Sequence, residues 1–108
     1  MDEQEFRTRS GEAMDRLYRK LSAASDHFEF EPDFNAGALT VEFDESKARF
    51  VVSPNAPVRQ IWVSAHSKSF KLDWDATREA FVMKDTGQTL EELMAAAIGQ
   101  QLGESVTL

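Results

Sequence analysis

A chain of 108 residues that is 42% hydrophobic and 29% charged has the composition of one globular domain, expected to span residues 1–108, and not that of a disordered chain. It contains no cysteine, which excludes disulfides, thiolate metal sites and a cysteine nucleophile. The net charge of −7 argues against nucleic acid or an anionic membrane as partner, and since no membrane-spanning or targeting segment is visible we expect a cytoplasmic protein.

An amphipathic helix is predicted over about residues 3–24. Its apolar side recurs at steps of three and four residues, through Phe6, Ser10, Ala13, Met14, Leu17 and Leu21. On the outer side, Glu5, Glu12 and Asp15 each precede an arginine by four residues, at Arg9, Arg16 and Arg19. We therefore expect these helix acids to be paired and solvated.

The next segment alternates with a period of two, which predicts a strand over residues 27–34. The phenylalanines fall on one face, and the other face carries His27, Glu29, Glu31 and Asp33. Pro32 cannot donate to a ladder, so the strand is expected at a sheet edge. Residues 21–46 contain seven acids and no Lys or Arg, while the other 12 acids (19 less 7) equal the 12 basic residues, so the whole net charge lies here.

Two interpretations of this acidic strand remain open. Carboxylate oxygens suit hard cations, and His27 could add a nitrogen ligand. Side chains two residues apart on a strand are separated by roughly 6.5–7 Å, so such a site would be shallow, completed by water and weak. Alternatively, the acids form a solvated edge that prevents aggregation between strands.

A series of strands and a closing helix complete the chain. Further strands are predicted over residues 39–44, 47–53, 58–65, 69–74 and 79–84. Thr89 and Glu92 fit a capping box at the start of the last helix, and Gly103 is placed to end it. A helix, about six strands and a helix predict an α+β fold: a two-layer α-β sandwich with both helices on one face of an antiparallel sheet.

One strand carries an aromatic side chain on its polar face. Ile61 and Val63 share one face of the strand over residues 58–65, which leaves Gln60, Trp62 and Ser64 on the other. A tryptophan rimmed by polar groups is typical of a recognition surface, although a second layer of the protein covering it is the alternative. We expect Trp62 to be exposed and Trp74, which is in phase with Leu72, to be largely buried.

The residues along several segments resemble one known family. They are Glu5-Phe6, the run from Asn35 to Val41, the run from Asn55 to Ser64 with its Pro-x-x-Gln-Ile-Trp core, Asp73-Trp74, and the run from Asp85 to Leu90. With these motifs in this order, the chain resembles the bacterial frataxins, the CyaY family, over nearly its whole length. A single frataxin-like domain over residues 1–108 is therefore expected.

The resemblance implies an α-β sandwich that binds iron (Fe²⁺ or Fe³⁺) weakly and assists iron–sulfur cluster assembly. We expect a monomer. It implies a cysteine desulfurase and an iron–sulfur scaffold protein as partners. Iron and the desulfurase would use an acidic ridge, whose candidate residues here are Asp26, His27, Glu29, Glu31, Asp33, Glu12 and Asp15. The scaffold would use the exposed sheet face, with candidates Gln60, Trp62, Ser64 and Lys71.

The chain departs from the family pattern late in the first helix. Where the family has a dense run of acids, this chain has Tyr18, Arg19, Lys20 and small residues. No catalytic motif and no Glu-x-x-His pair is present, so we do not expect an enzyme. Two hypotheses remain: a metallochaperone that donates iron to cluster assembly, or an allosteric modulator of the desulfurase–scaffold complex for which iron is incidental.

Overall fold

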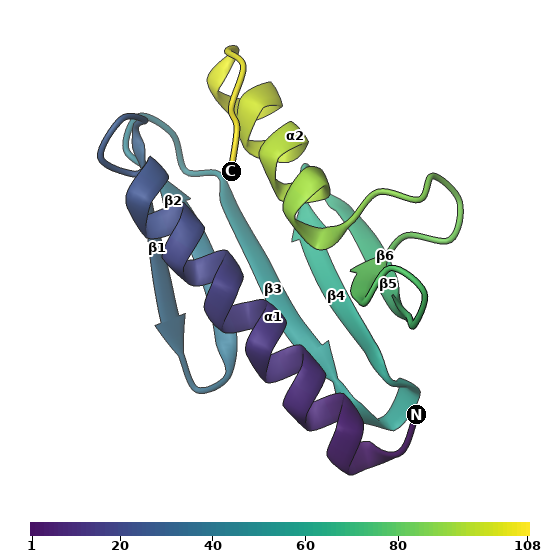
Figure 1. Cartoon of the computed structure of the whole chain (residues 1–108). Coiled ribbons are helices and arrows are strands. Elements are labelled where there is room, and N and C mark those ends of the chain that lie inside the picture. Colours follow the sequence, from purple (N-terminus) through teal and green to yellow (C-terminus); the bar gives the residue numbers. More distant parts are fainter.

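The computed structural model describes residues 1–108 and shows two helices on one face of a sheet (Figure 1). In chain order the elements are α1 (Glu3–Ala24), β1 (Phe30–Asn35), β2 (Ala38–Phe43), β3 (Arg49–Asn55), a 3-10 turn η1 (Ala56–Val58), β4 (Gln60–Ala65), β5 (Lys68–Asp75), β6 (Ala80–Val82) and α2 (Leu90–Leu102). The six strands are adjacent in sequence order and every pair is antiparallel. The predicted two-layer α-β sandwich is confirmed, with β1 at one edge.

The core lies between the helices and the inner face of the sheet. The periodicity of α1 buries one stripe of the helix, and each strand turns alternate side chains inward. The fully buried side chains with the largest volumes are Phe6, Met14, Leu17, Leu21, Phe30, Leu39, Phe50, Ile61, Leu72, Phe81, Met94 and Ile98. Asp2 caps α1 by accepting a hydrogen bond from the Glu5 amide at 2.7 Å.

The first strand is shorter than predicted. The backbone amides of Ser25 and His27 donate to the carbonyls of Leu21 and Ala24 at 2.9 Å each, so the last turn of α1 continues into a tight turn. Extended structure therefore begins only at Phe30. The prediction of one strand over residues 27–34 is wrong at its start, and the acids on either side of residue 30 belong to different local structures.

The connection between β3 and β4 also differs from the prediction. β3 continues to Asn55, and Val58 belongs to η1, so β4 begins at Gln60 and not at residue 58. Arg59 has a left-handed φ of 55°, and its amide donates to the Ala56 carbonyl at 3.2 Å. This reversal explains why Val58 is out of phase with the core residues of β4 and is 51% exposed. At the far edge, β6 is confined to three residues where six were predicted.

The end of the chain closes the layer formed by the helices. The predicted capping box is present: the Glu92 amide donates to Thr89 Oγ1 at 3.2 Å, and the Thr89 amide donates to Glu92 Oε1 at 2.9 Å. Gly103 ends α2 with a φ of 73°. The chain then folds back along α2 (Figure 1), and Val106 and Leu108 pack against the core.

Two helical glycines should respond in opposite ways to alanine. A Cβ on Gly99 would lie 2.8 Å from the Glu104 carbonyl oxygen, so Gly99→Ala must displace the returning tail. We expect it to lower the free energy of unfolding by about 1–2 kcal/mol despite the better helix propensity of alanine. Urea denaturation followed by far-UV circular dichroism measures the change.

Gly11→Ala is the matched control. Gly11 is exposed in the interior of α1, and a Cβ there meets no atom within 4 Å. The substitution should therefore stabilise the protein by about 0.5–1 kcal/mol. A gain in stability from both substitutions would show that the tail does not rest on Gly99.

Candidate functional site

The outer face of the sheet presents one tryptophan held by polar neighbours. Trp62 is 37% exposed, and its indole N–H donates to Gln60 Oε1 at 2.9 Å. Gln60 in turn donates through Nε2 to Asp73 Oδ1 at 3.1 Å. Lys71 lies opposite Trp62 on β5, with its ammonium 5.0 Å from the centre of the indole ring. The indole is thus held in one orientation without being covered.

The four sheet-face candidates lie on the same face, as predicted. The register of β4 with β5 aligns Gln60 with Asp73, Trp62 with Lys71, and Ser64 with Ser69. Sequence reasoning missed Asp73, which anchors Gln60. The short turn between β4 and β5 fixes this register, so the hairpin itself was the signal that could have identified Asp73.

Trp74 lies on the inner face and packs against the core with part of its surface still exposed, which agrees with the predicted burial. Its ring packs edge-on against Phe81 at 5.1 Å between centres, and the Arg9 guanidinium lies 5.1 Å from its centre. β6 is too short and α2 begins too late to close over this end of the inner face. An arginine therefore provides the cover that an apolar residue provides elsewhere.

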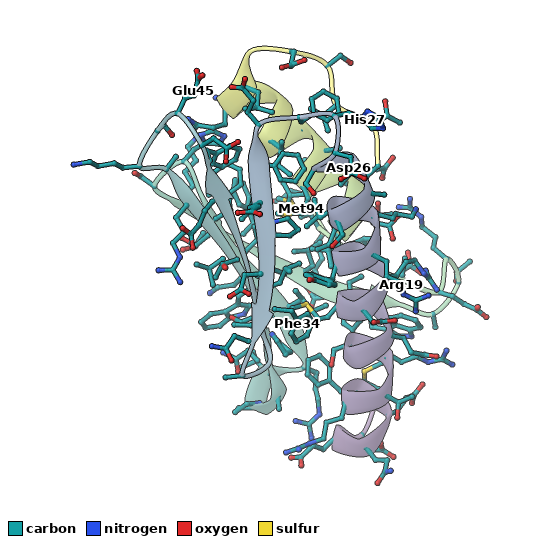
Figure 2. The ribbon with its side chains drawn as sticks, turned by 90° about the vertical axis from the view of Figure 1, so that its left-hand side faces the viewer. Arg19, Asp26, His27, Phe34, Glu45 and Met94 are labelled. Atoms are coloured by element: carbon teal, nitrogen blue, oxygen red, sulfur yellow. The ribbon has the colours of Figure 1, made fainter.

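The predicted acidic ridge divides into two groups. Glu31 and Asp33 lie on the outer face of the sheet, where Glu31 is opposite Glu42 on β2. Asp26, His27 and Glu29 lie in the turn between α1 and β1. Figure 2 shows Asp26 and His27 at the same end of the molecule as Glu45 of the turn after β2.

The group at the end of α1 gains acids that the prediction omitted. The register that pairs Phe30 with Phe43 places Glu29 beside Asp44, whose amide donates to the Glu29 carbonyl at 3.2 Å. Repulsion by Glu45 raises the pKa of Glu29 above its usual value of 4.5, and burial, Asp44, a hydrogen bond to Glu45, and Glu104 add to the increase. We call this region the acidic end, made up of Asp26, His27, Glu29, Asp44, Glu45 and Glu104.

The two helix candidates lie apart from the acidic end and are paired. Asp15 pairs with Arg19, as predicted. Glu12 lies 4.0 Å from Arg9 and not beside Arg16, which corrects the predicted pair. Arg9 also lies 4.0 Å from Glu5, so one guanidinium sits between two carboxylates. These exposed pairs leave α1 with little free negative charge.

The acidic residues do not form a closed metal site. No three His, Asp or Glu side chains converge closely enough to hold a metal ion. Carboxylates and imidazole suit iron chemically, but ligands at this spacing would leave most of its coordination shell to water.

Neither helix is long and apolar enough to span a membrane.

Comparison with known proteins agrees with the fold and the motifs. The family model of the frataxin-like domain matches residues 1–104. The chain belongs to the frataxin family. Among its relatives, the iron-sulfur cluster assembly protein CyaY of Pseudomonas aeruginosa is 32% identical over 95 residues, which cover 86% of this chain and 87% of the relative. That of Dechloromonas aromatica is 29% identical over 108 residues, with 100% and 99% covered.

Solved frataxins share the fold at low sequence identity. The frataxin of Psychromonas ingrahamii superposes with a TM-score of 0.77 at 22% identity, covering 99% of this chain and 97% of that one. The trimeric frataxin of Saccharomyces cerevisiae gives 0.72 at 18% identity, with 89% and 80% covered. The sandwich is therefore the frataxin architecture.

The acidic end should make the stability of this frataxin depend on pH. Because the folded pKa of Glu29 is raised, the folded state binds more protons than the unfolded state between pH 4.5 and that higher value. Ionisation of Glu29 thus opposes folding at pH 7, and this destabilisation is removed as the pH falls below about 4.5. Glu29→Gln is expected to raise the Tm at pH 7 and to have no such effect at pH 4, as measured by differential scanning calorimetry.

Glu92 provides a control with the opposite sign. Hydrogen bonds from the backbone and side chain of Thr89 lower the pKa of Glu92. Its ionised form stabilises the fold above the unfolded pKa, and that contribution is lost as the pH falls through the folded value. Glu92→Gln should therefore lower the Tm at pH 7. Equal shifts in both variants would rule out local repulsion as the cause of the Glu29 effect.

Proposed function

We propose that this protein assists iron–sulfur cluster assembly as a non-enzymatic accessory protein of a cysteine desulfurase and an iron–sulfur scaffold protein. The family membership and the relatives named as iron-sulfur cluster assembly proteins support the pathway. The observation that carries the proposal is the presence of two unlike surfaces: the acidic end, and the sheet face around Trp62. The proposal takes the protein as a cytoplasmic monomer that binds neither nucleic acid nor a membrane.

The acidic end is the proposed contact for the desulfurase. It lies within the segment from residue 21 to residue 46, which holds seven acids and no Lys or Arg, joined by Glu104 from the C-terminus. The raised pKa of Glu29 reflects repulsion that a cationic partner would relieve. A basic surface on the partner would be attracted over several ångströms before contact.

The sheet face is the proposed contact for the scaffold. An aromatic side chain that is already oriented loses little conformational freedom on binding, and its burial contributes apolar area. Trp62 meets this condition because Gln60 and Lys71 hold the indole from two sides. Ser64 continues the exposed polar rim along β4.

Iron binding is proposed to be weak and to involve Asp26, His27, Glu29, Glu31 and Asp33 before Glu12 and Asp15. The helix acids are neutralised by Arg9 and Arg19, whereas no ion pair involves any of the five. The lack of a converging ligand group favours the regulator over the iron donor, because a donor must hold its cargo until transfer. In the iron-donor alternative, iron as Fe²⁺ or Fe³⁺ is the cargo that the protein delivers.

The decisive experiment measures iron affinity and desulfurase activity side by side. Sulfide release by the purified desulfurase is followed with and without this protein, in iron-free buffer and with Fe²⁺. We expect the protein to change the rate in both buffers, as a regulator would. A change that requires Fe²⁺ would support the iron donor, and no change in either buffer would contradict the proposed function.

Matched variants locate the effect. The triple variant Glu29→Gln, Asp44→Asn, Glu45→Gln should lose most of the effect on the desulfurase. The triple variant Glu29→Gln, Glu31→Gln, Asp33→Asn should lose most of the Fe²⁺-induced NMR shifts. The control Glu12→Gln, Asp15→Asn removes two acids that are already paired, so it should change little. The reverse ranking would assign the function to the helix.

A further inference from the structure

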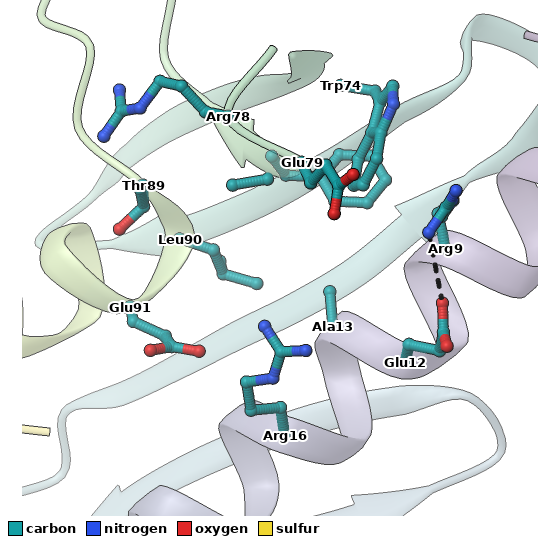
Figure 3. A pocket seen from close by; sticks show the side chains of 12 residues that line it. Arg9, Glu12, Ala13, Arg16, Trp74, Arg78, Glu79, Thr89, Leu90 and Glu91 are labelled. Atoms are coloured by element: carbon teal, nitrogen blue, oxygen red, sulfur yellow. Dashed lines mark ion pairs between the residues drawn. The ribbon is translucent and has the colours of Figure 1, made fainter. Parts of the chain in front are cut away.

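A pocket of about 280 Å³ opens between α1, the β5–β6 hairpin and the start of α2 (Figure 3). It lies on the opposite side of the sheet from Trp62 and does not include the acidic end. Its volume is just below the range typical of sites for drug-sized ligands, so it would hold a smaller molecule. The pocket is assembled from three segments that are distant in sequence.

Some charged side chains of the pocket are already paired with other groups of the chain, and others are not. Arg9 lies between Glu5 and Glu12, and Glu91 binds the Lys20 ammonium at 2.6 Å. Arg78 donates to the Gly87 carbonyl at 2.6 Å, and its guanidinium lies 3.9 Å from Glu92. These contacts hold the walls of the pocket together and are already satisfied within the chain.

Arg16 and Glu79 are the two charged side chains of the lining that have no ion pair or side-chain hydrogen bond. Figure 3 shows the Arg16 guanidinium reaching into the pocket from α1 and the Glu79 carboxylate reaching in from the β5–β6 turn, beside Trp74. The pocket thus offers one cation and one anion on facing walls. Each is free to meet a charge of a ligand.

Glu79 occupies a position where glycine would be less strained. Its φ is 50°, a left-handed value that costs a non-glycine residue roughly 1 kcal/mol or more. Asp75 Oδ1 accepts hydrogen bonds from the amides of Thr77 at 3.0 Å and Arg78 at 3.2 Å, which fixes the turn in this conformation. The turn therefore presents a carboxylate to the pocket from a defined backbone position.

Apart from Thr89, the remainder of the wall is apolar. Trp74 and Phe81 form one side, and Ala13 and Leu90 face them from the two helices. Arg9 covers one part of the Trp74 ring, which is otherwise half-buried. A ligand that places its charges on Arg16 and Glu79 would therefore have its remaining atoms against an aromatic and aliphatic surface.

We propose that this pocket binds a free α-amino acid with an apolar side chain. Its carboxylate accepts hydrogen bonds from the Arg16 guanidinium, its ammonium donates to the Glu79 carboxylate, and its side chain packs against Trp74 and Leu90. A simple anion would face the unpaired Glu79, and a simple cation would face the unpaired Arg16, whereas a zwitterion satisfies both. The inference does not depend on the proposed function in cluster assembly.

The test is an NMR titration of the ¹⁵N-labelled protein with L-leucine, observed at the indole N–H of Trp74. Trp62 on the opposite face is the control within the same sample. We expect saturable shifts at Trp74 and none at Trp62. Isocaproate and isoamylamine, which lack the ammonium and the carboxylate of leucine respectively, should each bind at least about tenfold more weakly.

Two variants test whether Arg16 and Glu79 contact the charged groups of the ligand. Arg16→Gln and Glu79→Gln should each weaken leucine binding about tenfold or more, and both side chains are exposed, so the core is unaffected. Arg19→Gln, which removes a nearby arginine paired with Asp15 outside this pocket, should leave binding unchanged. The proposal is overturned if leucine causes no saturable shift, if isocaproate binds as tightly as leucine, or if neither variant weakens binding.

Discussion

Trp74→Ala is expected to lower the free energy of unfolding by about 2–3 kcal/mol, somewhat less than truncation of a fully buried aromatic residue costs. Trp74 loses its edge-on contact with Phe81 and its contact with the Arg9 guanidinium, both at 5.1 Å. The loss opens the inner layer at the end where β6 is short. Urea denaturation followed by far-UV circular dichroism measures it without relying on tryptophan fluorescence.

Trp62→Ala is the matched control, since it truncates the same residue type on the opposite face. Its ring is exposed and rests on Gln60 and Lys71, so the free energy of unfolding should fall by less than about 1 kcal/mol. Affinity for the scaffold protein should fall instead, because the aromatic anchor is removed. A larger stability loss at Trp62 than at Trp74 would contradict the assignment of Trp62 to recognition.

Association with the cysteine desulfurase is expected to weaken markedly as salt rises. Charges attract over about 8–10 Å near physiological ionic strength, and the acidic end concentrates carboxylates within a segment, residues 21–46, that has no Lys or Arg. We expect the Kd from calorimetry to increase roughly tenfold between low and high salt. The variant Glu29→Gln, Asp44→Asn, Glu45→Gln should bind weakly at low salt and respond little to added salt.

The scaffold contact should behave in the opposite way. Burial of an indole depends on apolar area removed from water, which salt screens little. Trp62→Ala should therefore weaken scaffold binding at every salt concentration and leave the desulfurase affinity nearly unchanged. If the desulfurase affinity ignored salt, or fell as much with Trp62→Ala as with the acidic variant, the two partners could not be assigned to separate surfaces.

The sequence predicted the fold well because its signals were local and mutually consistent. The stripe from Phe6 to Leu21 and the Thr89–Glu92 capping box each specify a helix within a few residues. Strand ends were less certain, because they depend on backbone hydrogen bonds. The amides of Ser25 and His27 donate to the carbonyls of Leu21 and Ala24, so β1 begins later than the alternation predicts. The left-handed conformation of Arg59 separates Val58 from β4.

Among the candidate sites, those set by one strand could be predicted, and those that depend on contacts between distant segments could not. Trp62 could be placed on the exposed face from alternation alone, because one strand decides it. The acidic neighbours of Glu29 could not be predicted in this way. Asp44 and Glu45 lie near Glu29 because β1 pairs with β2, and Glu104 lies near it because the C-terminal tail folds back. The pocket between Arg16 and Glu79 joins three segments distant in sequence, which no periodicity connects.

The assignment of the two partners to separate surfaces is tested most directly by an NMR map of the ¹⁵N-labelled protein bound to unlabelled cysteine desulfurase. We expect backbone signals to shift or broaden at residues 26–29 and 44–45, and the Trp62 indole to be unperturbed. Addition of the scaffold protein should then perturb Trp62 and its neighbours on β4 and β5. Perturbation by the desulfurase centred on Trp62, with the acidic end unaffected, would contradict the central claim.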